Sequence, residues 1–175
     1  ITKMYEQTIA ISGTHGKTTT TSMLSLAFIE GKKDPTIQVG AELKQLNGNY
    51  RVGNTPYFII EACEYVESFL KFDTKTAVIL NIEEDHLDYY KNLEHIKSSF
   101  KKFVDSVPED GYVIVNGDSV DCLDIIKDVE QIKAQYKHIK KVLLSNELPK
   151  DKKQELINKF LSDNLNKDYE VAVID

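Results

Sequence analysis

Short runs rich in β-branched residues alternate along the chain with longer stretches in which apolar residues recur every three or four positions. Gln7–Ser12 is predicted to be a buried strand. Three later runs are apolar without alternation, which is typical of strands covered on both faces of a parallel sheet. These runs are Tyr57–Ile60, Thr76–Leu80 and Tyr112–Val115. Strands and helices that take turns predict an α/β fold, in which right-handed crossovers place helices around a mostly parallel sheet.

Two helices are expected among these strands. The first covers Lys17–Glu30, and Gly31 followed by Pro35 would end it. Its inner face is expected to consist of Met23, Leu24, Ala27 and Phe28. The second carries one apolar stripe, formed by Leu93, Ile96, Phe100 and Phe103. The segment Gly40–Pro56 is rich in Gly, Asn and polar residues and is predicted to be a loop, with room for a short hairpin around Asn47–Tyr50.

The remaining part of the chain continues the alternation. Its expected elements are a helix over about Val120–Tyr136, a strand at Lys141–Leu144, a helix from Lys150 to about Leu161 and a strand at Val171–Ile174. We therefore expect a single domain over residues 1–175. Because the chain stops directly after the strand-like run VAVID, we expect this domain to be truncated.

The composition excludes several classes of function. A chain of 175 residues with 41% apolar and 29% charged residues can bury a full core, so general disorder is excluded. The formal net charge of −6 leaves no basic surface for a nucleic-acid backbone, so no nucleic-acid partner is expected. No apolar run approaches the roughly 18 residues of a membrane span, and the first residues lack the pattern of a signal peptide. Cys63 and Cys122 are far apart, which indicates reduced thiols and a cytoplasmic location.

The strongest chemical signal is the segment Ile11–Thr21, ISGTHGKTTTT, between the first strand and the first helix. The N–H groups of such a glycine turn point into one concave space, and the helix behind it adds positive partial charge, so the segment predicts a phosphate-binding loop in a P-loop NTPase-like domain. Lys17 can reach the β- and γ-phosphates, and the Thr18 hydroxyl can bind Mg²⁺. The expected nucleotide-binding residues are Gly13, Thr14, His15, Gly16, Lys17, Thr18 and Thr19. Ile11 replaces the first glycine of the longer Walker pattern, and the competing interpretation is a glycine turn before a threonine-rich helix.

Two polar clusters follow strands whose carboxyl ends share one edge of the predicted sheet. Tyr57–Ile60 runs into Glu61, and Thr76–Leu80 runs into NIEEDHLD, which contains His86. Ligands of open parallel sheets bind beyond the carboxyl ends of the strands, so both clusters are expected beside the loop. Mg²⁺ prefers hard oxygen ligands and keeps several waters, which makes Thr18 and Glu61 a sufficient pair. His86 is expected to bind a second metal ion or to steady a reacting carboxylate.

Simpler interpretations stay open for several of these residues. A carboxylate at a strand end is often a helix N-cap, a role available to Asp85 or Asp88. His15 could contact a phosphate or only orient the turn. Cys63 lies near the expected site, but no base stands beside it in the sequence, which favours an inert thiol over a nucleophile.

Four segments in this order resemble the central ATPase domain of the Mur ligases: ISGTHGKTTTTSM, EACEYVESFL, LNIEEDHLDYY and SFKKFVDSVPEDGYVIVNGD. The resemblance covers roughly Ile1–Asp118. The histidine in the loop, together with HLDYY and ESFL, makes the chain most similar to the members that join L-alanine to UDP-N-acetylmuramate in peptidoglycan biosynthesis. The resemblance implies one ATP-binding domain over residues 1–175, the truncated middle of a three-domain ligase, with no clear match over 119–175.

The resemblance also implies a reaction and a role for each site residue. ATP would activate the lactyl carboxylate of UDP-N-acetylmuramate as an acyl phosphate, and the amine of L-alanine would then form the amide. Lys17 would neutralise charge on the γ-phosphoryl group, and Thr18 with Glu61 would hold one Mg²⁺. His86 would serve the second metal near the substrate carboxylate, which makes Lys17, Glu61 and His86 the expected catalytic residues. Phosphoryl transfer depends mainly on positioning and charge neutralisation, so no side-chain nucleophile is required.

The chain also departs from the family pattern. The N-terminal domain that binds the UDP portion, the C-terminal domain and the later His-Asn segment are missing, so we expect the chain alone to fold and to bind ATP weakly but not to ligate. Cys63 stands where the commoner motif has Asp, and it receives no metal role. The alternatives are another ligase of the superfamily, such as the murein tripeptide recycling ligase, a non-catalytic nucleotide-binding module, and a small P-loop kinase. The single arginine, Arg51, argues against the kinase.

Overall fold

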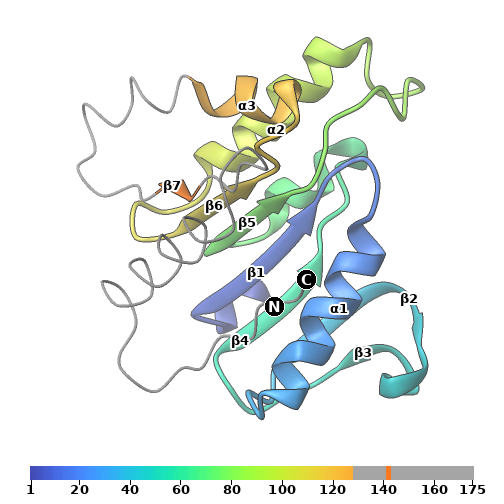
Figure 1. Cartoon of the computed structure of the whole chain (residues 1–175), viewed down its shortest axis with the longest axis vertical. Coiled ribbons are helices and arrows are strands. Elements are labelled where there is room, and N and C mark those ends of the chain that lie inside the picture. The colour runs from blue at the N-terminus through green and yellow to red at the C-terminus, as the bar shows by residue number, and fades with distance from the viewer. Residues whose placement is uncertain (128–140, 143–175) are drawn as a thin grey trace, which may run out of the picture. The chain divides into compact units, whose positions relative to one another are not determined.

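The computed structural model describes residues 1–127 and 141–142 (Figure 1). The strands within these residues form one sheet in the order β3-β2-β4-β1-β5-β6-β7. Their bounds are β1 Gln7–Ser12, β2 Thr36–Leu43, β3 Gly48–Arg51, β4 Tyr57–Glu61, β5 Thr76–Ile79, β6 Tyr112–Val115 and β7 Lys141–Val142. All neighbouring strands are parallel except β2 and β3, which are antiparallel. The mostly parallel α/β sheet predicted from the sequence is therefore confirmed.

Helices cover both faces of this sheet. The α-helices are α1 Lys17–Glu30, α2 Leu93–Asp105 and α3 Val120–Lys127, and the 3-10 helices are η1 Thr2–Met4, η2 Lys44–Leu46 and η3 Tyr65–Lys71. Phe28 of α1 contacts Tyr57 of β4 with ring centroids 5.3 Å apart, whereas Phe58 belongs to the core that contains α2. Successive strand residues point to opposite faces, so α1 and α2 lie on opposite sides of the sheet.

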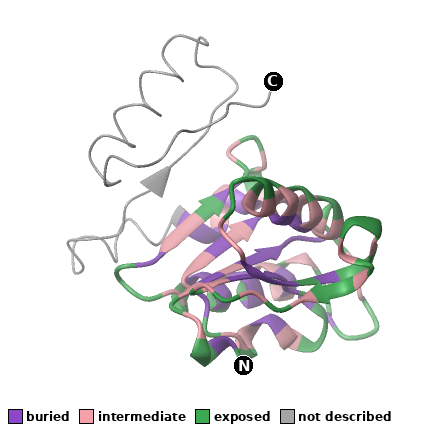
Figure 2. Ribbon diagram, turned by 90° about the horizontal axis from the view of Figure 1, so that it is seen from below, coloured by how far each residue is buried: buried purple, intermediate pink, exposed green. Residues whose placement is uncertain are grey.

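The main core lies between the sheet, α2 and η3, and Figure 2 shows the buried residues gathered along the strands and on the inward sides of the helices. Phe69 of η3 stacks on Phe103 of α2 with ring centroids 4.7 Å apart and meets Phe100 edge-on at 5.3 Å. The stripe predicted for α2 is confirmed, because Ile96, Phe100 and Phe103 are buried and Leu93 packs against the same core. Among the described residues, no helix has both the length and the apolar character needed to cross a bilayer.

The predicted inner face of α1 is partly wrong. Met23 is 57% exposed, and Ala27 is exposed as well, whereas Thr21 and Ser25 are buried. α1 is thus rotated about its axis relative to the prediction. The start of the helix explains this difference, because the Lys17 side chain turns into the loop that precedes α1. Residues four and eight positions further along lie on the same side of a helix, and these positions hold Thr21 and Ser25.

The predicted loop Gly40–Pro56 is wrong over much of its length. β2 extends through Gly40 to Leu43, and the chain returns along β3 to form an antiparallel hairpin. The predicted hairpin is therefore present and includes Tyr50, but its turn lies at Lys44–Asn47, where Asn47 has a left-handed φ of 52°. Buried Ile37 and Val39 alternate with exposed Gln38 and Gly40, so the strand signal was present but was outweighed by the glycine and asparagine content.

The other predicted bounds agree closely with the structure. β1, α1 and β6 have the predicted limits, β4 includes Glu61, and β5 ends one residue before Leu80. α3 begins at Val120 as expected, and β7 begins at Lys141. The predicted continuations to Tyr136 and Leu144, the helix from Lys150 and the strand at Val171–Ile174 lie outside the described residues.

Candidate functional site

The loop between β1 and α1 has the backbone geometry of a phosphate-binding turn. Gly13 and Gly16 adopt φ values of 136° and 82°, which residues with a side chain rarely adopt. A Cβ on Gly13 would also lie 3.1 Å from the backbone nitrogen atoms of Leu80 and Asn81. Thr20 donates its N–H to the carbonyl of Gly16 at 3.0 Å, so α1 begins directly after the loop. The N–H groups at the start of α1 and the helix dipole can therefore act together on an anion.

Asn81 at the end of β5 holds this loop in place. Its side-chain oxygen accepts the His15 N–H at 2.8 Å, and its amide nitrogen donates to the His15 carbonyl at 3.0 Å. Thr14 also donates its N–H to the Asn81 carbonyl at 3.1 Å, and its hydroxyl accepts the Glu83 N–H at 2.9 Å. The His15 side chain is 65% exposed, with its Nε2 atom 3.7 Å from a Glu83 carboxylate oxygen. Asn81 is the first residue of the NIEEDHLD segment, and its role in holding the loop is not evident from the sequence.

Lys17 lies across the loop. Its Nζ atom donates to the carbonyls of Gly13 at 2.6 Å and Thr14 at 3.1 Å. The same atom is 3.1 Å from Oε1 and 2.9 Å from Oε2 of Glu64, whose side chain is 2% exposed. Lys17 is therefore placed at the loop as predicted. Its ion pair with Glu64 was not foreseen, although the spacing of Glu61 and Glu64 in EACE was visible in the sequence.

Thr18 and Glu61 come together at the carboxyl ends of β1 and β4. The Thr18 hydroxyl donates to Oε1 of Glu61 at 3.0 Å, and Oε2 of Glu61 accepts the N–H of Gly40 at 2.7 Å. A hydroxyl and a carboxylate are hard oxygen ligands of the kind that Mg²⁺ prefers, and the adjacent loop is suited to phosphate oxygens. The donor set therefore fits a magnesium–nucleotide complex.

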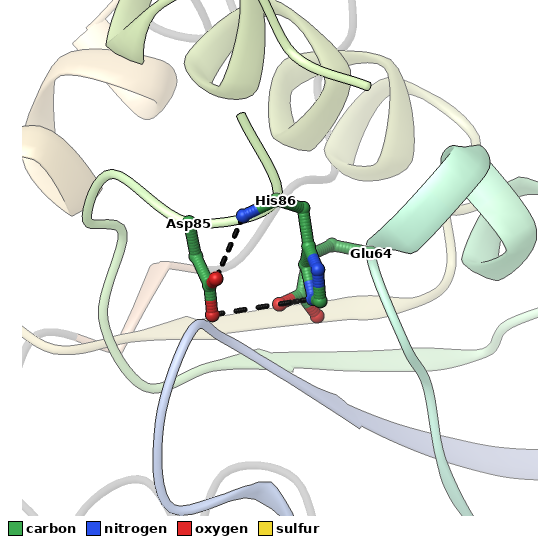
Figure 3. A group of neighbouring side chains, drawn as sticks. All are labelled: Glu64, Asp85 and His86. Carbon is green, nitrogen blue, oxygen red and sulfur yellow. Dashed lines mark hydrogen bonds and ion pairs between the residues drawn. The ribbon is translucent and has the colours of Figure 1, made fainter. Parts of the chain in front are cut away.

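His86 belongs to a second group, with Glu64 and Asp85 (Figure 3). Its Nε2 atom is 3.8 Å from Oε1 of Glu64 and 4.0 Å from Oδ2 of Asp85, and one potential ligand atom from each residue lies within 4.8 Å of the others. The sequence predicted Thr18, Glu61 and His86 as metal ligands. The structure pairs Thr18 with Glu61 and groups His86 with Glu64 and Asp85, and Glu64 also pairs with Lys17, which precedes Thr18 in the chain. His86 also has a left-handed φ of 51°.

Tyrosines pack around this second group. The Tyr65 ring lies over His86 with ring centroids 4.6 Å apart, and the Tyr65 hydroxyl donates to Asp88 at 2.7 Å. This hydrogen bond raises the pKa of Tyr65. The hydroxyl of buried Tyr90 donates to the Glu64 carbonyl, and burial raises the pKa of Tyr90 to about 12. The tyrosines therefore fix both the backbone of Glu64 and the ring of His86.

Asp85 and Asp88 do not act as the N-cap of the helix that follows them. The N-cap of α2 is Asn92, whose side chain accepts the His95 N–H at 2.9 Å, so neither Asp85 nor Asp88 caps this helix. Asp85 instead accepts the N–H of His86 at 2.7 Å. Cys63 is exposed and Cys122 is buried, and both are free thiols.

The fold and the loop define a P-loop NTPase-like α/β domain. The chain belongs to the Mur ligase family, because the family profile of the Mur ligase middle domain matches residues 11–171. This match continues beyond Asp118, where the recognisable motifs end.

Relatives and solved structures agree with this assignment. The chain is 57% identical over 129 residues to a UDP-N-acetylmuramate–L-alanine ligase of Acetivibrio thermocellus, covering 74% of the chain and 28% of that protein. It is 52% identical over 130 residues to the ligase of the same name from Alkaliphilus metalliredigens, again covering 74% and 28%. The chain thus spans less than a third of the length of these relatives.

Two crystal structures have a similar fold. One is a UDP-N-acetylmuramate:L-alanyl-γ-D-glutamyl-meso-diaminopimelate ligase from Neisseria meningitides, with a TM-score of 0.67, 28% identity and coverage of 73% of this chain and 44% of that one. The other is the UDP-N-acetylmuramate–alanine ligase of Thermotoga maritima, with a TM-score of 0.61, 30% identity and coverage of 70% and 28%.

Proposed function

We propose that this chain is the ATP-binding part of a cytoplasmic ligase that joins L-alanine to UDP-N-acetylmuramate in peptidoglycan biosynthesis. The observation that carries the proposal is the Thr18–Glu61 hydrogen bond of 3.0 Å beside the glycine loop, which combines a hard oxygen pair with an anion-binding helix start. The substrate assignment is supported by the relatives at 52–57% identity that carry this name. We infer that the chain forms one middle domain and that its relatives' remaining length supplies the parts that bind the two substrates.

In the proposed reaction, a carboxylate oxygen of UDP-N-acetylmuramate attacks the γ-phosphorus of ATP, and ADP leaves. The amine of L-alanine then attacks the carbonyl of the acyl phosphate, loses a proton and expels phosphate as the amide forms. The loop N–H groups orient the phosphates, and the Lys17 ammonium neutralises charge that develops on the transferred group. Thr18 and Glu61 would hold Mg²⁺, which supplies further charge neutralisation when bound.

For His86 we propose a role at the substrate carboxylate rather than at the nucleotide. It lies with Glu64 and Asp85, a set of one nitrogen and several oxygen ligands that suits a second divalent cation. This group adjoins the loop through the Lys17–Glu64 ion pair, so these residues would hold a cation close to the loop, where it would supply positive charge for a reacting carboxylate. Lys17, Glu61 and His86 are accordingly the catalytic residues of the proposal.

The first experiment measures ATP binding by the 175-residue chain in the presence and absence of Mg²⁺, using isothermal titration calorimetry. We expect binding that Mg²⁺ strengthens and that Lys17→Met abolishes, with no amide product when UDP-N-acetylmuramate and L-alanine are added. Absence of ATP binding in the folded wild-type chain would refute the proposal. Amide formation by the chain alone would refute our inference that further domains are needed.

A chimera tests the ligase activity itself. The matching 129-residue region of the Acetivibrio thermocellus relative would be replaced with this chain's segment, and release of ADP and phosphate would be measured with UDP-N-acetylmuramate, L-alanine and ATP. Activity that disappears with Lys17→Met supports a catalytic domain. A folded chimera that binds ATP but never ligates would favour a non-catalytic nucleotide-binding module. The likeness to the Neisseria enzyme makes a peptide-recycling ligase the second candidate, and that assignment predicts ligation of a peptide in place of L-alanine by the protein that carries this chain.

A further inference from the structure

Gly40 contacts the site from a strand that carries none of the predicted site residues. Its N–H donates to Oε2 of Glu61 at 2.7 Å. The pairing of β2 with β3 is irregular between Gln38 and Leu43, which leaves the Gly40 N–H available for this bond. Hydrogen bonds to a charged acceptor are the stronger ones, so this contact constrains the carboxylate.

Space, and not backbone conformation, requires glycine at this position. Gly40 is not among the described glycines with positive φ, which are Gly13, Gly16 and Gly48. A Cβ on Gly40 would lie 2.7 Å from each carboxylate oxygen of Glu61 and 2.9 Å from its Cδ. These atoms are the far end of a flexible side chain, and residue 40 is itself exposed. A larger residue would therefore displace the carboxylate while the strand keeps its place.

We propose that Gly40 is a positioning residue for Glu61, an inference that rests on the function proposed above. Its N–H fixes one carboxylate oxygen, and Thr18 meets the other at 3.0 Å. A carboxylate that is already oriented loses little conformational entropy when it takes a ligand. The glycine thus sets how strongly the Thr18–Glu61 pair recognises a nucleotide-bound divalent cation without touching the nucleotide.

The test compares Gly40→Ala with Ala41→Ser, which adds one atom to the next, exposed residue of β2. ATP affinity is measured with and without Mn²⁺ for each chain. We expect Gly40→Ala to lower the enhancement of ATP affinity by Mn²⁺ about tenfold, the size expected for one lost hydrogen bond to a charged group. Affinity without the cation and the melting temperature should stay at wild-type values, as should all three quantities in Ala41→Ser. A purely structural glycine would instead lower the melting temperature and leave the enhancement intact, which would overturn the proposal.

The failure of this inference is distinguishable from failure of the proposed function. A wild-type chain without ATP binding contradicts the function, whereas equal Mn²⁺ enhancement in wild type and Gly40→Ala contradicts only the role of Gly40. If Gly40→Ala does not fold, the chemical shift of the Gly40 amide proton in the wild-type chain tests whether Gly40 donates to the Glu61 carboxylate. Its resonance should lie downfield and move upfield in Glu61→Gln, and an unchanged resonance would overturn the proposal.

Discussion

The Nζ atom of Lys17 lies 2.9 Å from Oε2 of Glu64, and the glutamate side chain is 2% exposed. This ion pair joins the loop after β1 to the segment after β4. Removal of one partner from a buried ion pair leaves an uncompensated charge, which costs more than the pair contributes. Lys17 therefore stabilises the fold at the same position where we propose that it meets a phosphate.

Substitution of Lys17→Met is expected to lower the free energy of unfolding by roughly 3 kcal/mol, because it leaves the Glu64 carboxylate buried without its cation. Urea unfolding monitored by circular dichroism measures this loss. The double variant Lys17→Met/Glu64→Gln is the control, since it removes both charges and should recover more than half of the lost stability. A double variant as unstable as Lys17→Met would contradict the ion-pair explanation.

The carboxylate of Glu67 predicts a specific pH dependence of stability. Lys102 donates to it at 2.7 Å and Ser99 at 2.6 Å, and these hydrogen bonds hold the pKa of Glu67 below its ordinary value of 4.5. Because the pKa is lower in the folded state, this stabilisation is complete above about pH 4.5 and disappears as the pH falls through the folded-state pKa. Glu67→Gln should therefore lose less stability than wild type between about pH 5 and pH 3 in urea unfolding.

The control for this prediction is Glu30→Gln, which changes an exposed carboxylate at the end of α1. It should keep the wild-type pH dependence. If the free energy of unfolding changes equally with pH in Glu67→Gln and in wild type, the Lys102 contact contributes nothing to the pH dependence of stability. Glu67 and the preceding Val66 have left-handed φ values of 53° and 48°, a backbone conformation that is costly for residues with a side chain.

The two cysteines should differ sharply in reactivity. Cys63 is exposed, whereas Cys122 is buried in the core, and burial raises the pKa of the Cys122 thiol. Titration with a chromogenic disulfide reagent at about pH 8 is expected to modify one thiol in the native chain and the other only after unfolding. Cys63→Ser should abolish the fast reaction. Two fast thiols in the native protein would contradict the packing of α3 against the core.

Substitution of Asn81→Asp should weaken ATP binding about tenfold, which is the size expected when one hydrogen bond that shapes the loop is lost. The aspartate keeps an acceptor for the His15 N–H, but it places a carboxylate oxygen against the His15 carbonyl, where the amide now donates at 3.0 Å. Asn47→Asp adds the same charge in the β2–β3 turn and should leave ATP affinity unchanged. Calorimetry with Mg²⁺ and ATP checks both, and equal affinities would contradict a role for Asn81 in shaping the loop.

The elements predicted correctly are those with strong local signals. The limits of β1 and β6 follow from compact apolar runs, and the start of α1 follows from the glycine turn before it. These signals can be read without knowledge of distant residues. β2 was missed because Gly40 and the polar residues around it are typical of loops. Its strand conformation depends on pairing with β4, in which Ile37 opposes Ile59.

The site shows the same division. The loop and Lys17 were identified because glycine spacing and the following lysine form a local pattern, and the position of Glu61 followed from the parallel sheet. The burial of Glu64 could not be predicted, since it depends on Lys17 from one loop and on Tyr90 from a segment beyond β5. The amide contacts of Asn81 likewise depend on the distance between two loops that only the folded chain brings together.

The strand order also determines when the loop can form. β1 is the first of the described strands, and its partners among them both follow it in the sequence, with Gln7 opposite Tyr57 in β4 and Ile9 opposite Thr76 in β5. During synthesis β1 must wait for both partners, and such non-local pairing slows folding and exposes an apolar segment to aggregation. The nucleotide cradle therefore cannot be completed before β5 has been synthesised, although the loop itself precedes both partner strands in the sequence.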